Sequence, residues 1–109
     1  MTGISIEASE RGKFTVLSVN GPINSYTFTE LQEKTMKHVG KSDLAIDLSG
    51  VTSMTSAGIG VILAAIEDAE AAGKRIFVIG PSEVARLAIE STGFSERFPT
   101  LASVKDLPV

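Results

Sequence analysis

A hydroxyl-rich segment lies near the middle of the 109-residue chain. Five of the eight residues from 49 to 56 are Ser or Thr, and apolar residues at helical spacing follow them. We therefore expect Ser56 to lie at or next to the N-cap of a helix, where free backbone N–H groups and the helix dipole favour negative charge. A phosphate on Ser56 would be stabilised there. The alternative is that Ser56 only caps the helix, as Ser commonly does at this position.

The residue types around this segment do not form a recognisable catalytic site. A serine nucleophile needs a base, and the single histidine, His38, is predicted to be a solvated group near the C-terminal end of the preceding helix, a favourable place for a cation. Gly58 and Gly60 begin a dinucleotide fingerprint, but Leu63 stands where its third glycine belongs. The two glycines instead permit a close backbone approach, either to a neighbouring strand or to a partner. We expect no catalytic residues, no enzymatic activity and no cofactor.

Metal binding is not expected from the remaining polar residues. The chain has no cysteine, which excludes thiolate sites. Asp43 and Asp47 are candidate carboxylate ligands, and so is the cluster of Glu67, Asp68 and Glu70. The cluster lies on adjacent turns of a polar helix face, so we interpret it as solvated surface.

Charge and hydropathy limit the classes of partner. Ten basic residues stand against thirteen acidic ones, a net charge of −3, and the basic residues are scattered, which argues against nucleic-acid binding. The longest nearly apolar run, residues 57–66, is about half of what a bilayer crossing needs. Neither a membrane insertion nor a secretory signal is expected, and the cytoplasm is the default location. Length and composition predict one globular domain over residues 1–109.

Hydrophobic periodicity predicts strands and helices that follow each other closely. Strands with period 2 or continuous apolar character are predicted over residues 4–8, 14–19, 43–48 and 74–79. The first two form a hairpin across Arg11-Gly12, and the second ends at residues 20–22. A polar loop, residues 49–55, is expected after the third strand.

Three helices are predicted between and after these strands. The first starts at a capping box formed by Thr27 and Glu30 and ends at Gly40. The second has apolar residues at helical spacing from Ile59 to Ala69, with Ser56 at or next to its N-cap, and is closed by Gly73. The third is capped by Ser82, carries apolar residues at 84, 87 and 88, and stops before Gly93, and a short final helix is predicted over residues 103–107.

This order of elements predicts an α/β fold. The strand, helix and strand from Leu44 to Ile79 form a βαβ unit, which requires a parallel pair, while the opening hairpin is antiparallel. The result is a small domain with a mixed sheet of four or five strands and three to four helices. In such sheets ligands and partners meet the carboxyl ends of the strands, where residues 49–56 begin.

The central segment resembles the central motif of the STAS domain, the family of bacterial anti-sigma factor antagonists. The resemblance is carried by residues 46–63, Ile-Asp-Leu-Ser-Gly-Val-Thr-Ser-Met-Thr-Ser-Ala-Gly-Ile-Gly-Val-Ile-Leu. Residues 21–24, Gly-Pro-Ile-Asn, resemble the family's Gly-x-Ile-Asp segment before the first helix. Residues 72–74 and 84–93 resemble its later half, so that the likeness covers nearly the whole chain.

The resemblance implies a partner switch. In that family the Ser of an Asp-Ser-x-Gly motif is phosphorylated by an anti-sigma factor that is also a Ser/Thr kinase, and a PP2C-type phosphatase reverses the modification. Ser56 occupies the acceptor place, so the unphosphorylated chain would bind the anti-sigma factor and release a sigma factor for transcription. The implied partner-binding residues are Asn24, Ser53, Met54, Thr55, Ser56, Ala57, Gly58 and Gly60.

Two residues depart from the family pattern. Thr55 replaces the Asp before the acceptor, and Asn24 replaces the Asp of the earlier segment. Both changes remove negative charge beside Ser56, and Thr55 itself is an alternative acceptor. They also leave open a constitutive interaction or transport-accessory module that uses the same fold without phosphorylation. The sequence does not decide whether the domain associates with itself.

Overall fold

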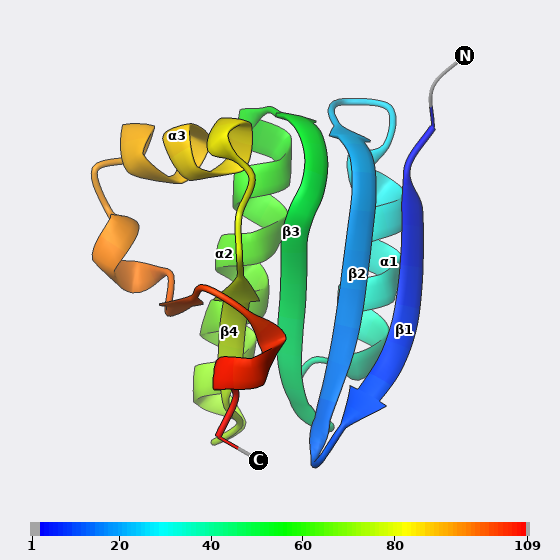
Figure 1. Ribbon diagram of the computed structural model, residues 1–109, viewed down its shortest axis with the longest axis vertical. Coiled ribbons are helices and arrows are strands. Elements are labelled where there is room, and N and C mark those ends of the chain that lie inside the picture. The colour runs from blue at the N-terminus through cyan, green and yellow to red at the C-terminus, as the bar shows by residue number, and fades with distance from the viewer. Residues whose placement is uncertain (1–2, 109) are drawn as a thin grey trace.

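The computed structural model describes residues 3–108, and the two ends of the predicted domain, residues 1–2 and 109, lie outside the described residues. A five-stranded mixed sheet with the order β1-β2-β3-β4-β5 forms the centre of the fold (Figure 1). β1 is antiparallel to β2, and all other neighbours are parallel. The strands are β1 (Ser5–Arg11), β2 (Phe14–Ile23), β3 (Asp43–Met54), β4 (Ile76–Ile79) and β5 (Thr100–Leu101). The predicted α/β class and mixed sheet are confirmed.

Three α-helices and two short 3₁₀ helices connect the strands. They are α1 (Phe28–His38), α2 (Ser56–Ala71), α3 (Glu83–Ser91), η1 (Ser95–Arg97) and η2 (Val104–Asp106). Figure 1 shows α1 and α2 side by side behind the sheet, with α3 across the end where β3 and β4 stop. The short final helix predicted at residues 103–107 is confirmed as η2. No helix within residues 3–108 combines the length and apolarity needed to cross a bilayer.

Alternation along the strands divides the apolar residues between the two faces of the sheet. One set, which includes Leu17, Leu44 and Ile46, packs against the helices, where Ile62 and Ile66 of α2 are also buried. The opposite face carries a smaller cluster, in which η2 and the C-terminal segment cover part of β3 and β4. The members of this second cluster are Phe14, Val16, Ala45, Ile79 and Leu107.

β2 and β3 both extend beyond their predicted ends. The predicted loop at residues 49–55 is wrong up to residue 54, because this segment continues β3 and pairs with residues 20–23 of β2. The register shifts twice along this pairing. Gly21, at φ +106°, and Gly50, whose missing Cβ leaves room for Asn20 Oδ1, allow the strands to stay paired through these irregularities.

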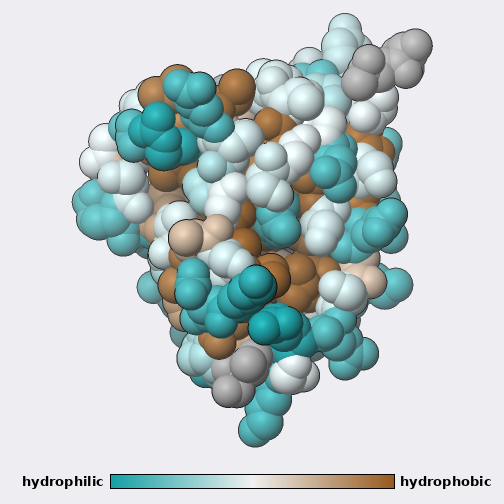
Figure 2. Space-filling model, viewed as in Figure 1, coloured by the Kyte–Doolittle hydropathy of each residue, from teal (hydrophilic) through white to brown (hydrophobic). Residues whose placement is uncertain are grey.

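The inward face of α3 uses only part of its apolar residues. The buried residues are Ala85 and Ile89, whereas Val84 and Leu87 are 43% and 51% exposed. Ser82 caps the helix as predicted, with its hydroxyl oxygen accepting the N–H of Ala85 at 3.3 Å. Figure 2 shows hydrophobic atoms over α3, at the upper left of the molecule, interspersed with hydrophilic ones.

Candidate functional site

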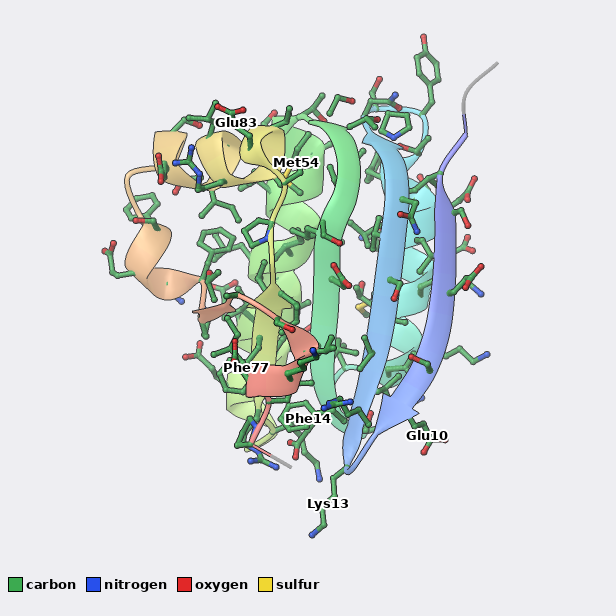
Figure 3. All side chains as sticks on the ribbon, viewed as in Figure 1. Glu10, Lys13, Phe14, Met54, Phe77 and Glu83 are labelled. Carbon is green, nitrogen blue, oxygen red and sulfur yellow. The ribbon has the colours of Figure 1, made fainter. Side chains whose placement is uncertain are left out.

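β2 and β3 end side by side, and this carboxyl-terminal end of the sheet carries the predicted site. Ile23, the last residue of β2, pairs with Met54, the last residue of β3. The N–H of Thr55 donates to the carbonyl oxygen of Ile23 at 3.0 Å. Figure 3 labels Met54 at this end of the sheet. The end of β2 therefore fixes the place where α2 begins.

Ser56 is exposed and is the first residue of α2. Thr55 is the N-cap residue, with an extended backbone at φ −98° and ψ 174°, and its side chain makes no capping hydrogen bond. The N–H of Ile59 donates to the carbonyl oxygen of Thr55 at 3.2 Å, so the N–H groups of residues 56–58 precede the first intrahelical bond. The predicted position of Ser56 at a helix start is confirmed, and the alternative that Ser56 caps the helix is wrong.

The first turn of α2 is electrostatically open to an added anion. It contains no acidic residue, and the aligned peptide dipoles place partial positive charge at this end. A phosphate on the first helical residue would therefore be stabilised in the free protein.

Asn24 organises the turn between β2 and α1. Its Oδ1 accepts the N–H of Tyr26 at 2.8 Å and the N–H of Thr27 at 3.1 Å. The hydroxyl of Thr27 accepts the N–H of Asn24 at 2.9 Å and donates to the carbonyl oxygen of Pro22 at 2.7 Å. The predicted capping box of Thr27 and Glu30 is therefore wrong, because the Thr27 hydroxyl is held by this turn and caps nothing in α1.

The two chain segments that form the surroundings of Ser56 contain no charged residue. Segments 20–29 and 49–60 form this end of β2 and β3 and the starts of α1 and α2. We call these two segments the site rim. Neither segment contains an acidic or basic residue. Tyr26, in the turn that Asn24 holds, is 89% exposed. Sequence reasoning missed Tyr26, although an aromatic residue between turn-forming polar residues was an available signal.

The two glycines of the rim have different surroundings. Gly58 is buried, and a Cβ built on it would overlap Cγ2 of Ile23, so packing against a neighbouring strand is confirmed for this residue. Gly60 is exposed, and a Cβ there would meet nothing within 4 Å. Only Gly60 leaves its backbone open to a partner.

A groove between α1 and α2 continues from the rim. It has a volume of about 230 Å³ and is lined on the α2 side by the small residues Ala57, Gly60 and Ala64. Phe28 and Met36 line it from α1, and Met36 is 55% exposed. This groove was not predicted from the sequence, although small residues at 57, 60 and 64 repeat with helical spacing.

The titratable groups considered in the sequence lie away from the rim. His38 ends α1, at the opposite end of the sheet from Ser56, and is half-buried. Burial lowers the pKa of His38, and the nearby positive charges of Lys37, Lys34 and Lys41 lower the pKa further. The predicted position of His38 near the C-terminal end of the first helix is confirmed.

Three of the five carboxylates considered as metal ligands are ion-pair partners. Asp43 pairs with Arg75 at 2.8 Å. Glu67 and Glu70 lie 3.7 Å and 3.9 Å from Arg97. No cluster of three or more potential ligand residues occurs in the described part of the chain.

Comparison with known proteins relates this arrangement to one family. The STAS domain family matches residues 5–107. The chain belongs to the STAS domain family. The anti-sigma-B factor antagonist of Staphylococcus aureus is 27% identical to it over 95 residues, which cover 85% of this chain and 88% of the relative.

Solved STAS structures share the fold. A crystal structure of an anti-sigma factor antagonist from Mycobacterium paratuberculosis superposes with a TM-score of 0.86 at 26% identity, covering 95% of this chain and 90% of the other. Phosphorylated SpoIIAA, a Bacillus cell fate determinant, superposes with a TM-score of 0.71 over 93% of this chain and 95% of its own. Its identity of 14% makes this a likeness of fold alone.

In this STAS domain both departures from the family pattern lie at the rim. Thr55 is exposed directly before Ser56, and Asn24 holds the neighbouring turn through its side-chain oxygen. An Asp at position 24 has oxygens that accept the same two N–H groups. Asn24 therefore keeps the geometry of the turn and removes only the negative charge.

Proposed function

We propose that this STAS domain is an anti-sigma factor antagonist whose binding is switched by phosphorylation of Ser56. The observation that carries the proposal is an exposed serine at the start of α2, within a rim that has no charged residue. The relatives named as anti-sigma factor antagonists support it. The unphosphorylated chain binds an anti-sigma factor with Ser/Thr kinase activity and thereby frees a sigma factor for transcription. A partner of this kind would place the chain in the cytoplasm.

The physical effect of the switch follows from charge at a neutral surface. A phosphate adds about −1.5 to −2 charges at pH 7. In the free protein the start of α2 and water stabilise this charge, but a partner covering the rim would have to desolvate it. A penalty of about 1–3 kcal/mol changes affinity roughly 5- to 150-fold. No refolding of the domain is needed.

The proposed partner surface is the rim together with the adjoining groove. Its residues are Asn24, Ser53, Met54, Thr55, Ser56, Ala57, Gly58 and Gly60, of which Gly58 acts by packing α2 against Ile23. Tyr26 extends this surface on one side, since large exposed aromatic residues are frequent anchors in interfaces. A PP2C-type phosphatase reverses the modification, and the exposure of Ser56 is compatible with access by both enzymes.

The absence of the family's two acidic residues supports a second candidate function. With Thr55 and Asn24 at the rim, a kinase that orients its substrate through carboxylates loses both contacts. The domain would then act as a constitutive interaction or transport-accessory module, with the same surface and no phosphorylation. Thr55 is the alternative acceptor, because its hydroxyl is exposed beside that of Ser56.

Phosphorylation in vitro separates these functions. The protein is incubated with ATP and a candidate cognate anti-sigma kinase, and the product is analysed by intact mass and fragment mapping. We expect one phosphate, on Ser56, and none on the Ser56→Ala variant. Thr55→Ala is the matched control, and a phosphate that disappears only in this variant would move the acceptor to Thr55.

A binding experiment with the same partner tests the switch. We expect native protein, Ser56→Ala and the control Ser9→Ala, an exposed serine of β1 outside the rim, to bind the partner, and Ser56→Asp to lose binding. Equal binding by all four proteins, with no phosphate transferred, would refute the switch and support the constitutive module.

A further inference from the structure

β1 forms one edge of the sheet, and its outer side has no neighbouring strand in the described part of the chain (Figure 1). Six of its seven residues are exposed. Edge strands present unpaired backbone groups to solvent, and proteins commonly protect them with charged side chains that disfavour pairing. The placement of the charges in β1 therefore decides whether a second strand is repelled or accepted.

The hairpin that joins β1 to β2 identifies the free backbone groups. Arg11 pairs with Phe14 across a two-residue turn, with Gly12 at φ +60°. The residues flanking such a turn form a hydrogen-bonded pair, and hydrogen-bonded and non-hydrogen-bonded pairs alternate from there. The odd-numbered residues of β1 therefore direct their N–H and C=O groups to β2. The even-numbered residues, 6, 8 and 10, direct theirs to the open edge.

Two of the three charged side chains of β1, Glu7 and Arg11, have opposite signs and lie on the same face. Glu7 and Arg11 lie on the face opposite α1 and α2, since their pairing partners are Ser18 and Phe14, and Phe14 belongs to the smaller apolar cluster. Both side chains are exposed, and neither makes an ion pair within residues 3–108.

We propose that two copies of this chain associate through β1, antiparallel, with Ser9 of each copy facing the other at a two-fold axis. In this register Ala8 and the partner's Glu10 exchange backbone hydrogen bonds, twice by symmetry. Glu7 then lies opposite the partner's Arg11, and Arg11 lies opposite the partner's Glu7. These are non-hydrogen-bonded positions, where side chains across an antiparallel pair come closest.

The charges select this register over its neighbours. Only pairings that join even-numbered residues to even-numbered residues satisfy the free backbone groups. A centre at Ala8 places Glu7 opposite the partner's Ser9 and leaves both charges without a partner. A centre at Glu7 places two carboxylates opposite each other, which is unfavourable.

The association is closed and does not use the site rim. A two-fold axis at β1 joins the two sheets into one continuous sheet and consumes the free edge of each copy, so a third copy cannot add there. Because β1 strands run antiparallel across the axis, the two Ser56 residues lie at opposite ends of the dimer. The inference is therefore independent of the proposed phosphorylation switch. Seven residues form a small interface, so we expect a weak dimer with a Kd of about 0.1–1 mM.

Sedimentation equilibrium tests the dimer and its register. Over a series from about 10 µM to about 2 mM, we expect native protein to approach twice the monomer mass. Glu7→Arg and Arg11→Glu each turn two attractions into two repulsions, and each should raise Kd about tenfold or more. Their matched controls are Glu96→Arg and Lys105→Glu, exposed sites away from β1 that undergo the same charge changes and should keep the native Kd.

Charge complementation distinguishes β1 pairing from a general charge effect. An equimolar mixture of Glu7→Arg and Arg11→Glu proteins should form a mixed dimer, and the double variant Glu7→Arg/Arg11→Glu should recover the native Kd. Ala8→Pro removes an N–H that faces the open edge, and should abolish the dimer while leaving the circular dichroism spectrum unchanged. A protein that remains monomeric throughout the series would overturn the proposal. A dimer insensitive to both charge reversals would overturn it equally, since it would use another face.

Discussion

Gly58 and Gly60 provide a matched test of how α2 is seated on the sheet. Both glycines lie in the first two turns of the same helix, and alanine favours a helix over glycine by up to about 1 kcal/mol at either position. They differ in what an added methyl group meets. At Gly58 it would overlap Cγ2 of Ile23 and lie 3.3 Å from Cβ of Ile23, which is fully buried. At Gly60 it would meet nothing within 4 Å.

The expected difference between the two alanine variants follows from these surroundings. Overpacking in a closed core costs about 1–3 kcal/mol. Gly58→Ala should therefore be less stable than Gly60→Ala by about 1–3 kcal/mol, because the helix propensity gain is similar in both. For a domain of this size the difference corresponds to at least about 4 °C in Tm. Gly60→Ala should be more stable than the native protein by up to about 1 kcal/mol.

Urea denaturation followed by far-UV circular dichroism measures both free energies of unfolding. A shift of the midpoint at constant m value identifies a change in stability rather than in the unfolded state. Ile23→Leu removes Cγ2 and should reduce the cost of Gly58→Ala in a double-mutant cycle. If Gly58→Ala were as stable as Gly60→Ala, the close packing of α2 on Ile23 would be refuted, and with it our account of what positions Ser56.

Three further predictions concern other contacts. The backbone N–H of Arg75 lowers the pKa of Asp43, and the Arg75 side chain lowers it further, whereas burial opposes both effects. The ionised carboxylate therefore stabilises the folded protein above the unfolded pKa. This stabilisation is lost as pH falls below about 4 and passes through the lowered pKa of the folded state. The stability advantage of native protein over Asp43→Asn should therefore disappear in acid denaturation series, and an advantage independent of pH would contradict the ion pair. Ser82→Ala should lower the free energy of unfolding by about 1 kcal/mol through loss of the α3 cap, measured by urea denaturation. Asn24→Ala should cost about 1–2 kcal/mol in the same assay, whereas Asn24→Asp should retain native stability, because only the alanine leaves the N–H groups of Tyr26 and Thr27 without their acceptor.

The main elements and the position of Ser56 were predictable because they depend on local patterns. Apolar alternation over residues 14–19 and helical spacing after residue 56 are properties of neighbouring residues in the sequence. The Ser82 cap has the same local origin, since its acceptor and the N–H of Ala85 lie three residues apart. The hydroxyl group at the start of α2 followed from these patterns without knowledge of the tertiary structure.

The extension of β3 was not predictable from composition. Residues 49–54 are mostly polar or Gly, and what makes them a strand is pairing with β2, which is distant in sequence. Which face of α3 packs inward was not predictable for a similar reason. Its sequence offers apolar residues on more than one face, and the sheet selects Ala85 and Ile89. At the first helix two local signals competed, and the turn formed by Asn24 engaged the hydroxyl that the capping box required.

The sequence by itself determined the α/β class, the order of the elements and the serine at the start of the second long helix, because hydrophobic period and capping chemistry act over a few residues. Only the tertiary structure decided which glycine is buried and which is open, because this depends on whether Ile23 or solvent faces each one. It also decided that segments 20–29 and 49–60 form one uncharged rim and that Glu7 and Arg11 share the open edge of the sheet. Such neighbourhoods arise from strand pairing between distant segments, and this pairing is not encoded in any short stretch of the chain.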